Sequence, residues 1–168
     1  MRFCNEAECK KWLADRARSK PDENPDLCSV QLDYPKEPHR IFSMANWLAQ
    51  SITFSQPALL WITEYGVLPS SENWHLYYRL RNSYGDHQLL QESPGHLFLG
   101  TQSEDLASFA QIAMLNGWGG CIVTEAGHVD AAFSHDEWIQ VYAKSPDLLI
   151  GFRKFFTETQ NPPTAGNS

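Results

Sequence analysis

The sequence has no lysine or arginine between Asn82 and Ala143, although this stretch contains eight carboxylates. The whole chain has a net charge of −7. A concentration of negative charge attracts cations or a basic partner and repels the phosphates of nucleic acid. The sequence therefore favours a basic protein partner and argues against nucleic-acid binding. The carboxylates are Asp86, Glu92, Glu104, Asp105, Glu125, Asp130, Asp136 and Glu137.

Long apolar runs and closely paired cysteines are also missing. No run approaches the roughly 18 to 20 residues that a membrane-spanning helix needs, so we expect no membrane association. The N-terminal segment MRFCNEAECKKWL lacks the apolar core of a secretory signal, which predicts a cytoplasmic protein. The four cysteines form no CxxC pair, and we expect reduced thiols with Cys9 and Cys121 buried.

No motif with a specific chemistry is present, and no cofactor is predicted. The GWGG segment at 117–120 matches neither phosphate-loop pattern. Ser134, His135 and Asp136 are adjacent in the chain, whereas catalytic triads are assembled from distant segments. The gaps between His87, His96, His128 and His135 are not those of an HxxxH helix or an HxH strand, so no metal site is predicted.

Hydrophobic periodicity and turn residues predict one α+β domain over residues 1–158, followed by a disordered tail at 159–168. Capping boxes are expected at Asn5 with Glu8 and at Thr101 with Glu104. The expected order is α-β-α-β-α-β-α-β-β, with a terminal hairpin that makes a mixed, mostly antiparallel sheet covered by helices. Helices are expected from Asn5 to before Pro21, from about His39 to Ser51, from a cap at Ser70 or Ser71 to about Tyr84, and at Thr101–Gly117, with a short last helix around Phe152–Phe156. Strands are expected at Ser29–Tyr34, Ala58–Val67, His96–Leu99 and Cys121–Thr124, with a return strand that reaches Ala143 and breaks near Ser134–Asp136.

Two segments require a choice between a core and a surface role. Trp118, held between glycines, is a candidate aromatic anchor for a partner, although core packing is the commoner position for tryptophan. In the helix around Trp74–Arg81, we expect the apolar side chains in the core and the arginines outside, where they pair with the acidic stretch. Asp136 and Glu137 are expected to point to opposite faces of an extended strand.

These observations favour an acidic protein-binding module that masks a basic partner. In charge and size alone, the chain resembles small bacterial immunity proteins, which neutralise a basic toxin nuclease by covering its active site. That resemblance implies an inhibitor or immunity-type function. The expected partner-binding residues are Trp118, Glu125, Asp130, Asp136 and Glu137.

One alternative is a small hydrolase-like enzyme, with or without a metal, that uses His128, His135 and Glu137. A second is a subunit of a larger assembly.

Overall fold

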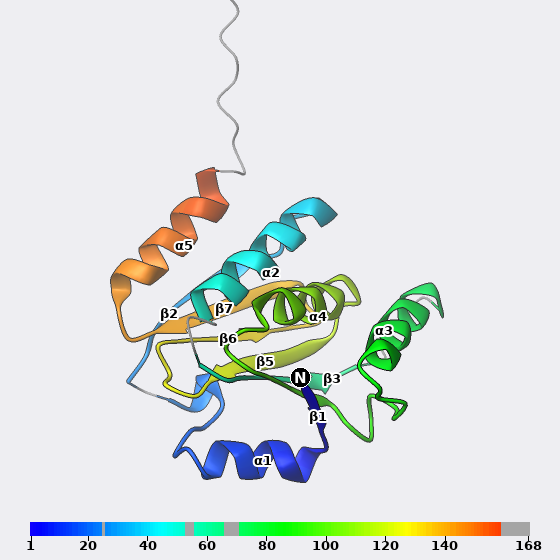
Figure 1. Cartoon of the computed structure of the whole chain (residues 1–168). Coiled ribbons are helices and arrows are strands. Elements are labelled where there is room, and N and C mark those ends of the chain that lie inside the picture. The colour runs from blue at the N-terminus through cyan, green and yellow to red at the C-terminus, as the bar shows by residue number, and fades with distance from the viewer. Residues whose placement is uncertain (25, 53–55, 66–70, 159–168) are drawn as a thin grey trace, which may run out of the picture.

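The computed structural model describes residues 1–24, 26–52, 56–65 and 71–158, which form a seven-stranded sheet with helices on both faces (Figure 1). The strand order is β1-β4-β3-β5-β6-β7-β2. The strands are β1 (Arg2–Cys4), β2 (Cys28–Asp33), β3 (Ala58–Glu64), β4 (Gly95–Phe98), β5 (Gly119–Thr124), β6 (Val129–Phe133) and β7 (Trp138–Ala143). The predicted α+β domain with a mostly antiparallel sheet is confirmed. All strand pairs within the described residues are antiparallel. The parallel pair that a mixed sheet would contain is not found among them.

The helices agree with the expected pattern, with differences at their ends. They are α1 (Glu6–Ala14), α2 (Pro38–Ile52), α3 (Ser71–Ser83), α4 (Ser103–Leu115) and α5 (Pro146–Glu158), and a 3-10 turn, η1 (Pro21–Glu23), follows α1. The capping box of α1 is confirmed, because Asn5 Oδ1 accepts from the Glu8 N–H at 2.9 Å and Glu8 Oε2 accepts from the Asn5 N–H at 2.8 Å. The predicted box at Thr101 is wrong, since α4 begins at Ser103 after Gln102, which makes no side-chain cap.

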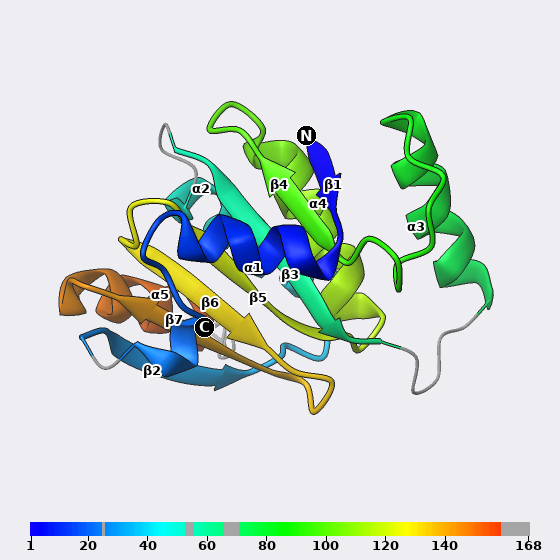
Figure 2. The same ribbon diagram turned by 90° about the horizontal axis from the view of Figure 1, so that it is seen from below.

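The sheet separates two hydrophobic cores. Helices α2, α4 and α5 cover one face, and α1 crosses the other (Figures 1 and 2). The larger core lies among α2, α4, α5, part of α3 and the inner face of the sheet. The smaller core lies beneath α1 and consists of Cys4, Cys9, Trp12, Leu13, Leu59, Trp61, Cys121 and Val123. The predicted burial of Cys9 and Cys121 is confirmed.

The two edges of the sheet come from the same N-terminal segment. Strand β1 pairs with β4 at one edge, and β2 pairs with β7 at the other. Between them the chain passes through α1 and η1 across the sheet face (Figure 2). The sequence pattern did not reveal β1, which has only three residues and includes a charged side chain. The expected break near Ser134–Asp136 is a turn that divides the return strand into β6 and β7.

A buried polar network attaches α3 to the sheet. Arg81 is fully buried, forms an ion pair with Asp86, and donates through Nη1 to Tyr77 Oη at 2.8 Å. Tyr77 Oη lies 2.7 Å from His96 Nε2 on β4. Because Arg81 already donates to this oxygen, the hydroxyl proton can be donated to a neutral His96 ring. Burial lowers the pKa of His96 to about 3, which keeps the ring neutral near pH 7. The expectation that both arginines lie outside is therefore wrong for Arg81.

Two sequence-based expectations concern the limits of the described chain. The predicted disordered tail at 159–168 and the predicted end of a strand at Val67 lie outside the described residues. Within the part of the chain that the structure describes, no helix has the length and apolar character needed to cross a membrane.

Candidate functional site

Two of the five predicted partner-binding residues are buried in the fold. Trp118 is 1% exposed and packs edge-on against Tyr77 and tilted against Trp74, with ring centroids 5.0 and 5.2 Å apart. The exposed aromatic anchor expected here is therefore a core residue. Asp130 is 0% exposed, so it is also absent from the surface. For Asp130 the sequence pattern could not show this, because its charged partner Arg18 lies more than one hundred positions earlier in the chain.

Asp130 lies on the sheet face that α1 covers, where it holds together three parts of the chain. Its carboxylate forms an ion pair with Arg18, whose side chain is 10% exposed. The other oxygen accepts from the Thr124 N–H at 2.8 Å and from the Thr124 hydroxyl at 3.0 Å. Burial raises the pKa of Asp130, whereas the Thr124 N–H and the Arg18 charge act in the opposite direction. This carboxylate therefore has a structural role beneath the loop that follows α1.

Other carboxylates of the acidic stretch are also paired within the chain. Glu125 accepts from Arg16 Nε at 2.8 Å, and Asp86 pairs with the buried Arg81. The basic residues that precede position 82 thus neutralise part of the charge that follows it. The negative field on the surface is weaker than the sequence alone suggests.

Four of the remaining carboxylates, Glu104, Asp105, Asp136 and Glu137, lie at opposite ends of the sheet. Helix α4, which carries Glu104 and Asp105 in its first turn, begins shortly after Phe98, the residue that pairs with the start of β3 at Ala58. The turn between β6 and β7 follows Phe133, which pairs with Gly120 near the end of β3. A seven-residue strand separates these ends by roughly 20 Å. The acidic stretch therefore does not form one continuous surface.

One acidic surface does remain, at the end of the sheet that contains the β6–β7 turn. We call the side chains of Glu64, Asp136 and Glu137 the acidic corner. All three residues are exposed. His135 Nδ1 lies 2.8 Å from Glu64 Oε2, and its Nε2 lies 3.4 Å from Asp136 Oδ1. The hydrogen bond with Glu64, together with the charge of Asp136, raises the pKa of His135. Sequence reasoning missed Glu64, because only the fold brings the end of β3 beside this turn.

The backbone of the β6–β7 turn differs from the extended strand that was expected for Asp136 and Glu137. The Glu137 N–H donates to the Ser134 carbonyl at 3.2 Å, and the Ser134 N–H donates to the Trp138 carbonyl at 3.0 Å. Glu137 has a φ of 62°. This is a three-residue hairpin loop with a left-handed last residue, a position that glycine usually occupies. The two carboxylates therefore project from a tight turn.

The residues of the alternative enzyme site are not brought together. His128 precedes β6, and His135 follows it, which separates them by roughly 20 Å along an extended chain. Glu137 lies in the same turn as His135, far from His128. Among the described residues, no group of three or more histidine, cysteine, aspartate or glutamate side chains is arranged to hold a metal ion.

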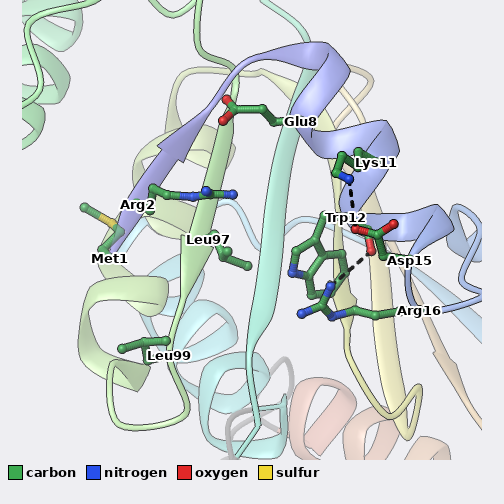
Figure 3. Close-up of a pocket in the computed structure, with 9 residues that line it drawn as sticks. All are labelled: Met1, Arg2, Glu8, Lys11, Trp12, Asp15, Arg16, Leu97 and Leu99. Atoms are coloured by element: carbon green, nitrogen blue, oxygen red, sulfur yellow. Dashed lines mark hydrogen bonds and ion pairs between the residues drawn. The ribbon is translucent and has the colours of Figure 1, made fainter.

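A cleft beside α1 was not indicated by the sequence. Figure 3 shows this cleft, which we call the α1 groove, between α1 on one side and β1 and β4 on the other. Its volume is about 590 Å³. The residues that line it are Met1, Arg2, Glu8, Lys11, Trp12, Asp15, Arg16, Leu97 and Leu99. It contains apolar and charged groups side by side, as a site for an amphipathic ligand does.

Comparison of the chain with models of protein families, with curated proteins and with solved structures gave no match.

Proposed function

We propose that this protein is a protein-binding module that engages a basic partner through the acidic corner. The observation that carries the proposal is the turn that presents Asp136 and Glu137. Glutamate occupies a left-handed position at which an L side chain costs about 1 kcal/mol or more. Such strained positions occur preferentially at functional sites, and here the strained residue presents a second exposed carboxylate from the same turn as Asp136.

The surroundings of the corner suit a lysine or arginine side chain. A hollow of about 280 Å³ lies beside it, and Thr63, Glu64, Ser134 and Trp138 are among the residues that line it. A cation in this hollow would meet the carboxylates of Glu64 and Asp22 and the Trp138 ring, all of which attract cations, whereas Lys20, which also lines the hollow, would repel it. Of the five residues expected from the sequence, Asp136 and Glu137 remain in the proposal, and Glu64 joins them.

The test uses a variant with Glu64→Gln, Asp136→Asn and Glu137→Gln. The control carries Asp26→Asn, Glu104→Gln and Asp147→Asn, which removes the same charge from exposed positions elsewhere. Both variants and the wild type are immobilised and exposed at low salt to lysate of the source cells. We expect a basic protein to bind the wild type and the control and to be lost from the corner variant, with affinity that falls as salt is added.

The affinity of the purified partner for the wild type and for each variant is then measured. Loss of about tenfold or more in affinity for the corner variant, relative to the control, supports the proposal. Equal affinity of the corner variant and the wild type at low salt would reject the acidic corner as the binding surface. Equal loss in both variants would show that net charge, rather than this location, governs binding.

A further inference from the structure

The α1 groove is separate from the acidic corner and has a different chemistry. Leu97 and Leu99 provide an apolar strip along β4 and the residue after it, and the Trp12 ring lines the opposite wall (Figure 3). Leu99 is 57% exposed. The volume of about 590 Å³ falls within the range of roughly 300 to 1,000 Å³ for small-ligand pockets. The groove therefore has the size and the apolar surface for a small molecule.

Arg2 supplies an available positive charge in this groove. Among the described residues its guanidinium has no ion pair, although it is within hydrogen-bonding reach of the Cys4 side chain, whereas the two other cationic side chains of the groove are ion-paired. Lys11 pairs with Asp15 at 3.7 Å, and Arg16 pairs with Glu125 at 2.8 Å. Figure 3 shows the Arg2 side chain extending from β1 toward α1, alongside Leu97. An unpaired guanidinium beside apolar surface is complementary to a carboxylate that carries an apolar tail.

The two acidic residues of the groove are already occupied. Glu8 accepts from the Asn5 N–H in the capping box of α1, and Asp15 pairs with Lys11. Each is held at the helix by its own partner. Lys11 thus neutralises Asp15, whereas Glu8 keeps its charge because its partner is a neutral N–H, so the carboxylate of a ligand is placed at Arg2 and not at Glu8.

Among the described residues, the indole N–H of Trp12 lacks a hydrogen-bond acceptor, which is evidence for a ligand independent of Arg2. This residue is 5% exposed, and within the described part of the chain its indole Nε1 has no hydrogen-bond partner. A buried N–H without an acceptor costs about 1 to 3 kcal/mol. In Figure 3 the nitrogen is on the side of the ring that faces Leu97, across the groove. An oxygen atom of a ligand in the groove would satisfy this donor.

We propose that the α1 groove binds a small amphipathic monocarboxylate, whose carboxylate pairs with Arg2 beside the Trp12 N–H and whose apolar tail covers Leu97 and Leu99. Unlike the acidic corner, this site selects an anion. The negative net charge of the protein opposes anion binding at long range, and screening at about 0.15 M salt limits that effect to within roughly 8 Å.

The probe is decanoate, titrated into ¹⁵N-labelled full-length protein at about 0.15 M salt. The indole signal of Trp12 is assigned by its absence from the Trp12→Phe variant. We expect saturable shifts of the Trp12 indole signal, with the indole signals of Trp47 and Trp138 unchanged. Decanol, which has the same tail without the charge, should bind at least about tenfold more weakly, because it forms no charge-assisted hydrogen bond.

Two variants test the assigned roles, and both change exposed side chains that leave the core intact. Arg2→Gln should weaken decanoate binding by about tenfold or more, and Leu99→Asp should abolish it through repulsion and loss of apolar surface. Arg153→Gln on α5, at an exposed position outside the groove, serves as the matched control and should bind as the wild type does. Unfolding midpoints close to that of the wild type confirm that each variant is folded.

Three results would overturn the proposal. The first is the absence of a saturable shift at Trp12. The second is equal movement of all indole signals, which would indicate detergent-like binding. The third is unchanged affinity in a folded Arg2→Gln variant.

Discussion

At the scale of single residues, Glu137 has a left-handed backbone conformation, which is unfavourable for a residue with a Cβ atom. Its φ of 62° closes the hairpin loop between Ser134 and Trp138, and its carbonyl accepts from the Tyr34 N–H at 2.6 Å. Glycine adopts this region without a Cβ clash, whereas other residues pay about 1 to 2 kcal/mol. Glutamate at this position thus lowers the stability of the protein and presents an exposed carboxylate.

Replacing Glu137 with glycine should therefore stabilise the protein. We expect Glu137→Gly to raise the free energy of unfolding by about 1 kcal/mol and the unfolding midpoint by roughly 2 to 4 °C. Calorimetry or denaturation followed by circular dichroism measures both quantities.

Asp136→Gly is the matched control, because Asp136 lies in the same loop without a positive φ. That variant should be unchanged or less stable by about 0.5 to 1 kcal/mol. A Glu137→Gly variant that is no more stable than the wild type would show that the turn stores no strain.

At the scale of elements, the loop after α1 is tied to the sheet by two arginines in different environments. Arg18 reaches the fully buried Asp130, and Arg16 reaches the partly exposed Glu125 while lying 4.5 Å from the Trp12 ring centre. Removal of one partner from a buried ion pair leaves an uncompensated charge, whereas surface pairs are screened by water. The two contacts should therefore differ greatly in energy.

We expect Arg18→Met to lower the free energy of unfolding by about 3 to 5 kcal/mol, because Asp130 loses its charged partner in the interior. Arg16→Met should cost about 1 kcal/mol or less, mainly through the contact with Trp12. Urea denaturation of the two variants measures the difference. Costs of similar size would contradict the role assigned to Asp130.

Local sequence signals predicted most elements but not the surface they form. The apolar stripe of α2 and the capping box of Asn5 with Glu8 are local, and both are confirmed. Strand β1 was missed because its stability comes from pairing with β4, more than ninety positions later in the chain. For the same reason the acidic stretch was misleading: only the folded sheet shows that Asp130 faces Arg18 and that Glu64 lies beside His135.

At the scale of the whole molecule, the N-terminal segment closes both edges of the sheet and covers one of its faces. Without β1 and α1, the backbone groups of β4 would form an open edge. The apolar surface of Leu59, Trp61 and Val123 beneath α1 would also be exposed. Open edges and large apolar patches promote association between copies of a chain.

Deletion of residues 1–18 should therefore convert the protein into oligomers or aggregates at micromolar concentration. Light scattering coupled to size-exclusion chromatography compares the truncated chain with the full-length chain at equal concentration. A truncated chain that remains monomeric with the circular dichroism spectrum of the full-length protein would refute this role.

The position of β1 and β2 also bears on the time course of folding. These strands are synthesised first, yet their partners β4 and β7 follow about ninety and one hundred and ten residues later. Contacts this distant in sequence are characteristic of slow folding, since long loops must close before pairing can compensate for the lost entropy. Strand β1 would thus remain unpaired on the ribosome until β4 has emerged, and β2 until β7 has emerged, so the docking of β2 would complete the sheet.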